Sequence, residues 1–236
     1  MQSIVLEQIP FHLDLRVLSR ELCVKERKSY FEDLSHLIRE AQRIGKPKAL
    51  YKLSFIEAKE DSHIVVDDVI LRSRMLRVNL EEVHRVFPYV ATCGTELEEW
   101  SNGIEDILMR YWAEEIKKAV LRMAIDFMER DILERFQAKM IACISPGSLE
   151  DWPIEEQRPL FSILGDTKGA IGVHLSECLF MIPTKSLSGI YFPTEVSFFT
   201  CQLCPREICP SRKATYDRAL YEKNISIKRP SQEIGD

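Results

Sequence analysis

Two stretches of sequence decide the fold: KMIACISPGSLEDWPIEEQ at residues 139–157 and GVHLSECLFMIPTKSLSGIYFP at residues 172–193. The first stretch begins with a short apolar run, over 140–144, that predicts a strand. Ser-Pro-Gly then predicts a turn, and Asp151 is placed to cap a helix that has a proline just inside its start and ends by Gly165. The pattern is therefore strand, turn and helix.

The second stretch predicts two more strands, one over 172–182 and one over 187–192. The last of these contains Gly189. A glycine inside a strand indicates a bulge or a place where another group comes close to the backbone. Gly189 is therefore the best physical indication of a ligand in this part of the chain.

The remainder of the chain alternates between helical and strand patterns. Apolar residues at spacings of three and four predict a helix over 26–45, with Gly45 as its C-terminal cap. The segment 104–138 has the longest helical pattern and predicts either one helix or two that break around 128–131. The other expected elements are an edge strand over 9–14, a hairpin of strands over 49–58 and 63–72, a short helix over 79–85, a strand over 86–93, a helix that starts at Thr95, and a short helix over 214–223.

The sequence assigns no catalytic residue. Asp67 and Asp68 are adjacent carboxylates in the expected strand over 63–72. Neighbours on a strand point to opposite faces of the sheet, so these two carboxylates are not expected to act as a pair.

Composition excludes several classes of protein. The chain has 236 residues, of which 45% are hydrophobic and 29% charged, which is an ordinary globular balance. Its net charge of −5 gives no general case for nucleic acid. No window is apolar enough to predict a membrane span, and the first residues lack the basic start and apolar core of a secretory signal. A cytoplasmic protein is expected.

The seven cysteines include a cluster near the C-terminus with the spacing Cys-x2-Cys-x4-Cys, formed by Cys201, Cys204 and Cys209. Two thiolates in Cys-x2-Cys can share one metal, and thiolates this close repel one another without a cation. The cluster therefore predicts a zinc site or an iron–sulfur cluster, which the spacing does not separate. A redox dithiol and inert thiols are the alternatives.

A fourth ligand for such a centre has to come from elsewhere in the chain. The candidates are Cys143, Cys178 and Cys93, and a non-protein ligand is a further alternative. Cys93 ends an expected strand and lies just before an expected helix, a geometry that can lower the pKa of a thiol. A buried structural cysteine is the favoured interpretation of Cys93.

The opening stretches resemble the activation domain of cobalamin-dependent methionine synthase. The resemblance rests on Ser145-Pro146-Gly147, on Trp152-Pro153, on LFMIP at 179–183 and on SLSGIYF at 186–192. It is specific over 139–193 and weaker from residue 86 onward. It implies an α+β fold, in which a twisted antiparallel sheet is flanked by helices.

The resemblance also implies site residues. Gly147 matches the glycine of the family's Arg-x-x-x-Gly-Tyr loop, and Tyr191 matches a later tyrosine that contacts S-adenosylmethionine. Ser145 and Pro146 lie in the same loop, where the backbone can contact that ligand. The arginine position of the family motif holds Cys143 and its tyrosine position holds Ser148. An acidic residue of the family falls near Ile125, beside Asp126.

The implied function is reductive reactivation. In the family, this domain binds S-adenosylmethionine and presents it to an inactive cobalamin enzyme while an electron-donor protein reduces the cobalt. The resemblance therefore implies a stand-alone reactivation factor for a cobalamin-binding methionine synthase or a related corrinoid protein. Cys143 would then join the C-terminal thiolates around a metal. The alternative is a non-catalytic interaction module with structural zinc that binds no S-adenosylmethionine.

A single domain over residues 1–236 is expected. It would include the Cys-rich segment 201–209 and end in a mobile tail over 225–236, which has no helical or strand pattern.

Overall fold

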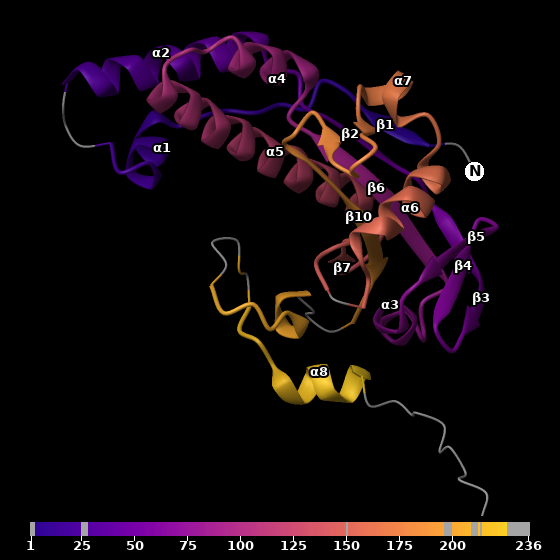
Figure 1. Ribbon diagram of the computed structural model, residues 1–236. Coiled ribbons are helices and arrows are strands. Elements are labelled where there is room, and N and C mark those ends of the chain that lie inside the picture. The colour runs from indigo at the N-terminus through magenta and orange to yellow at the C-terminus, as the bar shows by residue number, and fades with distance from the viewer. Residues whose placement is uncertain are drawn as a thin grey trace, which may run out of the picture.

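The computed structural model describes residues 3–24, 28–149, 151–195, 200–208, 212 and 214–225. Within them, eight strands form an antiparallel sheet around β6 (Arg85–Thr92) (Figure 1). One edge of β6 pairs with β2 (Lys48–Tyr51) and then with β3 (Ser54–Glu60). The other edge pairs with β10 (Ser186–Pro193), which also pairs with β7 (Ile141–Ile144). The sheet is completed by β1 (Ile4–Leu6) beside β2, β4 (His63–Val66) beside β3, and β5 (Val69–Arg72) beside β4.

The first face of the sheet is covered by the long helix α5 (Ile107–Arg135). Successive side chains on a strand point to opposite faces, and Tyr51, Tyr89 and Tyr191 point to this one. They pack against the buried α5 residues Ala124, Met128 and Ile132. We call this side the α5 face.

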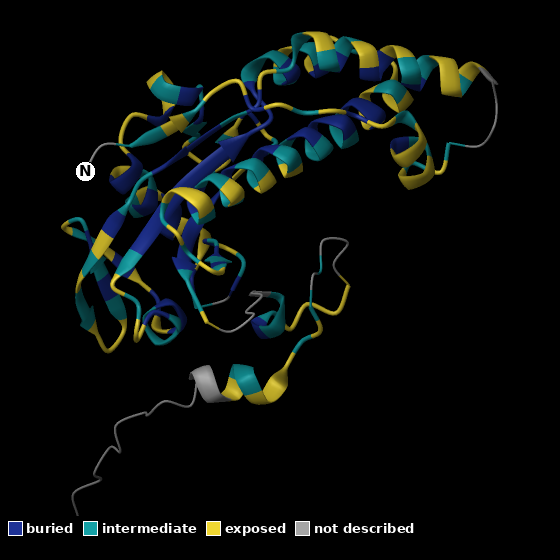
Figure 2. Ribbon diagram, turned by 180° about the vertical axis from the view of Figure 1, so that it is seen from behind, coloured by how far each residue is buried: buried dark blue, intermediate teal, exposed yellow. Residues whose placement is uncertain are grey.

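The second face of the sheet is covered by shorter elements. Leu50, Val90 and Ile190 point to this face. The elements over it are the hairpin β4–β5, α3 (Arg74–Asn79), the 3-10 turn η1 (Ile154–Glu156), α6 (Gln157–Leu164) and α7 (Thr167–Ile171). Figure 2 shows the buried residues gathered in the central strands and on the sides of the helices that face them.

A second layer of helices extends the molecule beyond the sheet. It consists of α1 (Leu15–Glu21), α2 (Lys28–Ile44) and α4 (Thr95–Asn102), which pack with the first half of α5 (Figure 1). Leu34, Ala41, Leu97 and Ile116 are fully buried in this layer because each lies on the apolar side of its helix. The result is a helical arm that is continuous with the α5 face.

The hairpin before β10 and the described residues after β10 complete the fold. A small hairpin of β8 (His174–Leu175) and β9 (Met181–Ile182) leads into β10. After β10 come the 3-10 turn η2 (Thr200–Leu203) and α8 (Arg218–Ile225), which packs against α3. Leu203 is fully buried in the core of the second face. Among the described helices, none is both long and apolar enough to cross a membrane.

The predicted α+β fold is confirmed, with an antiparallel sheet flanked by helices. The strands expected over 86–93, 140–144 and 187–192 correspond to β6, β7 and β10. The segment 104–138 contains one helix, α5, and no break near 128–131.

The predicted hairpin of long strands is wrong in detail. The segment 63–72 is itself a hairpin, β4–β5, that turns at Asp67 and Asp68, both of which have positive φ. Aspartate tolerates this left-handed conformation better than most residues. Asp67 bonds the ammonium of Lys52 at 2.7 Å and the hydroxyl of Ser54 at 2.8 Å, so it secures the turn. The segment 49–58 is divided into β2 and β3.

The helix predicted to start at Asn79 is not formed. Instead, Ser73 caps the start of α3, and α3 ends at Asn79. The carboxylate of Asp151, expected to cap its own helix, accepts bonds from the Ser73 hydroxyl at 2.7 Å and the Met75 amide at 2.8 Å. It therefore supports the start of α3.

Three further element predictions need correction. The segment 9–14 is not a strand, and its last residue, Asp14, caps α1. The edge strand of the sheet is β1. The segment 172–182 forms only the two short strands β8 and β9, and α7 was not predicted. Helix α8 begins at Arg218 and not at residue 214. In the expected tail, residues 226–236 lie outside the described residues.

Candidate functional site

The candidate site lies on the α5 face, where β10, β7 and α5 meet. Tyr191 of β10 is directly opposite Cys143 of β7. The Tyr191 ring packs on the ring of Tyr89, with 4.5 Å between centroids. Its hydroxyl donates a hydrogen bond of 2.6 Å to the Glu129 carboxylate on α5. This bond joins the sheet to the helix at the edge of the site.

Gly189 makes the arrangement possible. A Cβ atom there would lie 2.6 Å from the Ser145 Oγ, 2.7 Å from the Ile144 carbonyl oxygen and 3.1 Å from the Tyr89 ring. The Tyr89 hydroxyl lies 3.2 Å from the Cys143 Sγ. The close approach expected at Gly189 is therefore made by the protein itself, and this glycine is no longer an indication of a ligand.

The turn after β7 holds the three consecutive residues predicted to bind a cofactor. Gly147 has a φ of 77°, which favours glycine, and its amide donates to the Trp152 carbonyl at 2.7 Å. Pro146 is buried, and the Ser145 carbonyl accepts bonds from the amide and the hydroxyl of Ser148. Hydrogen bonds within the turn thus close it. The turn begins two residues after Cys143, which is opposite Tyr191 in the sheet.

The site is polar and lies beside buried aromatic rings. Burial raises the pKa of Tyr191 well above its usual value, and the neighbouring Tyr89, Cys143 and Glu129 raise it further. Burial, together with Cys143, also raises the pKa of Tyr89. Both phenols therefore stay protonated near neutral pH. The Tyr191 hydroxyl already donates its one hydrogen to Glu129, but its oxygen can still accept a hydrogen bond, and the Glu129 carboxylate can face a cation.

Sequence reasoning missed two of these residues. The acidic position on the long helix was expected near Ile125, whereas Glu129 is the acid that reaches Tyr191. Glu129 lies four residues later and hence on the same side of a helix, which is the signal that could have found it. Tyr89 was part of an apolar run, and its alternation with Phe87 and Ala91 places it on the α5 face.

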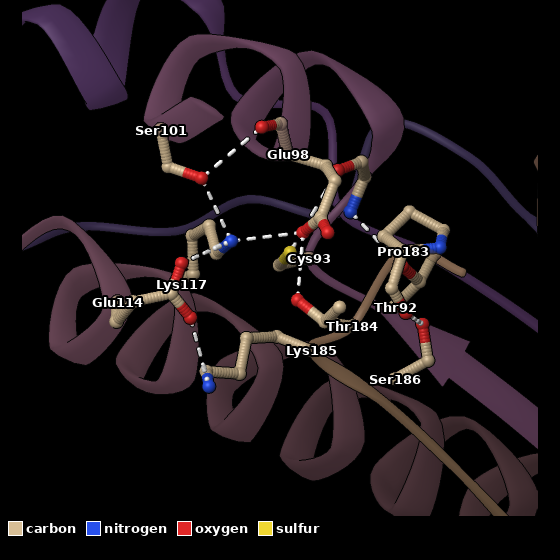
Figure 3. Close-up of polar contacts among 11 residues, drawn as sticks. Thr92, Cys93, Glu98, Ser101, Glu114, Lys117, Pro183, Thr184, Lys185 and Ser186 are labelled. Carbon is tan, nitrogen blue, oxygen red and sulfur yellow. Dashed lines mark hydrogen bonds and ion pairs between the residues drawn. The ribbon is translucent and has the colours of Figure 1, made fainter. Parts of the chain in front are cut away.

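A second polar cluster lies where α4, α5 and the start of β10 meet (Figure 3). The Lys117 ammonium is buried, with its side chain only 1% exposed, and bonds Glu114 at 2.6 Å and Glu98 at 2.8 Å. Glu98 also accepts from the Thr184 hydroxyl at 2.9 Å, and Glu114 pairs with Lys185 at 2.9 Å. Two lysines and two glutamates thus balance their charges across α4, α5 and the segment just before β10.

Cys93 lies beside this cluster and is buried. Burial raises the pKa of Cys93 to about 12, although Lys117 lowers it somewhat. The thiol therefore stays protonated, as a structural cysteine does.

The predicted metal ligands lie in separate parts of the structure. Cys201 and Cys204 are partly exposed at η2, and Cys204 packs against the core of the second face. Cys143 packs with the core of the α5 face, so it and Cys204 are on opposite sides of the sheet. Cys209 lies outside the described residues. No three His, Cys, Asp or Glu side chains in the described part of the chain are grouped to hold a metal, and the centre stays a prediction.

Comparison with known proteins identifies the fold. No family model matches the sequence. No curated protein matches it either. Among solved structures, the chain is similar to the crystal structure of the MetH reactivation domain bound to AdoHcy, with a TM-score of 0.59 and 13% identity. The match covers 85% of this chain and 81% of that one. The two share a fold, which confirms the structural resemblance inferred from the sequence.

Proposed function

We propose that this chain is a reactivation factor for a cobalamin-dependent methionine synthase or a related corrinoid methyltransferase. It would act as one domain in the cytoplasm, where its thiols stay reduced. One observation carries the proposal. The 145–147 turn lies beside the Tyr191–Glu129 pair, in a fold whose solved neighbour is bound to AdoHcy.

The residues on the α5 face suit much of S-adenosylmethionine, which carries a sulfonium, an ammonium and a carboxylate. The Glu129 carboxylate can face a cation, and the Tyr191 and Ser145 hydroxyls can orient polar groups. The backbone of the turn, Pro146 and Gly147 included, would border the ligand. Cys143 lacks the two parallel donors with which an arginine binds a carboxylate, so this end of the ligand would be held weakly.

S-adenosylmethionine would supply the methyl group, and the partner protein would supply its cobalamin. The part of this chain is to bind and orient the methyl donor and to present it to the partner. An electron-donor protein would be the other participant. Neither nucleic acid nor a membrane has a role in this proposal.

The proposal includes a metal centre held by the cysteine cluster. Its ligands would be Cys201, Cys204 and Cys209. The predicted fourth ligand, Cys143, lies on the other side of the sheet from Cys204, so it could join them only if the Cys-rich segment reached around the edge strand β7. An iron–sulfur cluster would store an electron for cobalt reduction, whereas zinc would stabilise the fold of the C-terminal segment. Iron, sulfide and zinc assays on protein purified without oxygen separate the two.

One observation favours a second function, that of a corrinoid-protein interaction module that binds no S-adenosylmethionine. Tyr191 is only 2% exposed, and its hydroxyl is already bonded to Glu129. A ligand that needs this hydroxyl would have to displace the carboxylate. The presence of Cys143 at the arginine position of the family motif also favours this second function.

Calorimetry with S-adenosylmethionine decides between the two functions. We expect a Kd in the micromolar range, about 1–100 μM, measured at two temperatures because burial of apolar surface makes the heat depend on temperature. Tyr191→Phe and Glu129→Gln should each weaken binding by about fivefold or more, through the loss of a polar contact. Tyr111→Phe is the control, since this tyrosine is on α5 but 53% exposed. Absence of heat at both temperatures would select the interaction module.

A further inference from the structure

The loop that carries Cys201 and Cys204 is wrapped around one guanidinium group. Arg212 donates through Nη1 to the carbonyl oxygens of Cys201 at 3.1 Å and Ala214 at 3.2 Å. It donates through Nη2 to the carbonyl oxygen of Cys204 at 3.3 Å and to that of Arg206. A single cationic side chain therefore ties together the two cysteine residues and the chain that follows them.

The two cysteines are also held by their own turn. The Cys204 amide donates to the Cys201 carbonyl at 3.3 Å, which closes a turn of four residues, 201–204. In such a turn the first and last Cα atoms are less than about 7 Å apart. Two thiolates at this separation can reach one metal ion, as in the Cys-x2-Cys pairs of metal sites.

The turn is fixed to the body of the protein between the two thiols. Leu203 is fully buried in the core of the second face. The Gln202 carbonyl accepts a bond of 2.8 Å from the Asp217 amide, just before α8. Both cysteines keep partial exposure. The loop is therefore held in place by its contacts with the rest of the protein before any metal binds.

We infer that Arg212 is a positioning residue for a soft-metal site at Cys201 and Cys204. Its bonds to the carbonyl groups set the loop in place before metal binds, and its positive charge offsets part of the charge of two thiolates. Outer contacts of this kind orient metal ligands and contribute to affinity. This inference rests on the metal centre of the proposed function and adds a residue to it that the cysteine spacing does not reveal.

The test uses the full chain, reduced, stripped of metal with a chelator and handled without oxygen. Cobalt(II) is titrated as the probe, because sulfur-to-cobalt charge-transfer bands in the near ultraviolet report thiolate ligation. Competition with zinc then gives the zinc affinity. Arg212→Gln is expected to weaken metal binding by about 10- to 100-fold, and Arg212→Lys by less, because lysine keeps the charge but not the fork of donors.

Two variants control for other causes. Arg218→Gln removes the same charge from the same segment, but this side chain bonds Glu222, at 2.7 Å, rather than the cysteine loop, so metal affinity should not change. Leu203→Ala loosens the attachment of the loop without removing a carbonyl bond. It should lower the thermal midpoint of the metal-free protein and weaken metal binding clearly less than Arg212→Gln does, because the bonds of Arg212 to the cysteine carbonyls remain.

The outcomes separate the two proposals. A wild-type protein that shows no charge-transfer bands contradicts the metal centre itself. A wild-type protein that binds cobalt while Arg212→Gln binds it equally well overturns only the role of Arg212. That role is also overturned if Arg218→Gln or Leu203→Ala weakens binding as much as Arg212→Gln does.

Discussion

Gly189 shows how one missing side chain shapes the α5 face. With no Cβ at this position, Tyr89 crosses the neighbouring strand and its hydroxyl reaches Cys143. Gly189→Ala would place a carbon 2.7 Å from the Ile144 carbonyl oxygen, which belongs to a paired strand and cannot move freely. We expect a loss of about 1–3 kcal/mol in the free energy of unfolding, measured with urea.

The matched control for this substitution is Gly103→Ala. Gly103 ends α4 with a φ of −79°, and a Cβ there would meet nothing nearer than 3.5 Å. The free energy of unfolding of Gly103→Ala should differ from that of the wild type by less than about 1 kcal/mol. Equal effects of the two substitutions would mean that the space at Gly189 is not needed.

Lys117 is the residue on which the second polar cluster depends. Lys117→Met removes the ammonium and leaves the carboxylates of Glu98 and Glu114 facing each other with less compensation. Breaking a buried ion pair in this way costs about 3–5 kcal/mol. Lys118→Met is the comparison, because Lys118 pairs with Glu115 at 2.6 Å with its side chain 35% exposed. An exposed pair contributes about 1 kcal/mol or less. Urea unfolding should therefore separate the two variants clearly, and similar losses would show that Lys117 is not effectively buried.

At the scale of elements, the same cluster ties α4 and α5 to the start of β10. Burial acts to raise the pKa of Glu114, but hydrogen bonds from Lys117 and Lys185 outweigh it, and the pKa lies below the usual 4.5. A lowered pKa means that the carboxylate stabilises the fold above pH 4.5 and loses this effect as pH falls through its folded value.

Glu114→Gln tests this dependence. It should destabilise the protein at pH 7, and the difference from wild type should shrink once the pH is below 4.5. Urea unfolding at several pH values measures it. Glu115→Gln, from the surface pair on the same helix, should have a small effect throughout. A penalty for Glu114→Gln that stays constant into acid would rule out the ionic role.

The elements that the sequence predicts well are those whose pattern is local and long. Helix α5 and strands β6 and β10 carry uninterrupted apolar periodicity, which side-chain burial on one or both faces requires. The predictions that failed depend on distant partners. Asp151 caps a helix 76 residues earlier in the sequence, and no local spacing indicates that.

The candidate site follows the same rule. The turn with Gly147 is recognisable because its residue types are needed locally, at a positive φ. The bond between Tyr191 and Glu129 joins residues 62 positions apart, and the resemblance alone placed the acid near Ile125. Local sequence thus locates the loop, while tertiary packing chooses the side chains that face it.

At the scale of the whole molecule, the sheet separates two regions of interest. The candidate site lies on the α5 face, whereas Cys201 and Cys204 belong to a segment attached to the second face. An electron or a structural signal that passed between them would have to cross the sheet or pass around β7, its edge strand on that side. The attachment of the C-terminal segment therefore decides whether the two regions can work together.

Leu203 tests that attachment. Its side chain is fully buried with residues of the second face, near the partly buried Leu220 and Tyr221 of α8. Leu203→Ala should lower the free energy of unfolding by about 2–4 kcal/mol through lost contact and a residual cavity. Ile208→Ala lies in the same segment, where the side chain is 87% exposed, and should change it by less than about 0.5 kcal/mol. If both substitutions were neutral in urea unfolding, the segment would not be docked in solution, and the thiols would be free to move independently of the sheet.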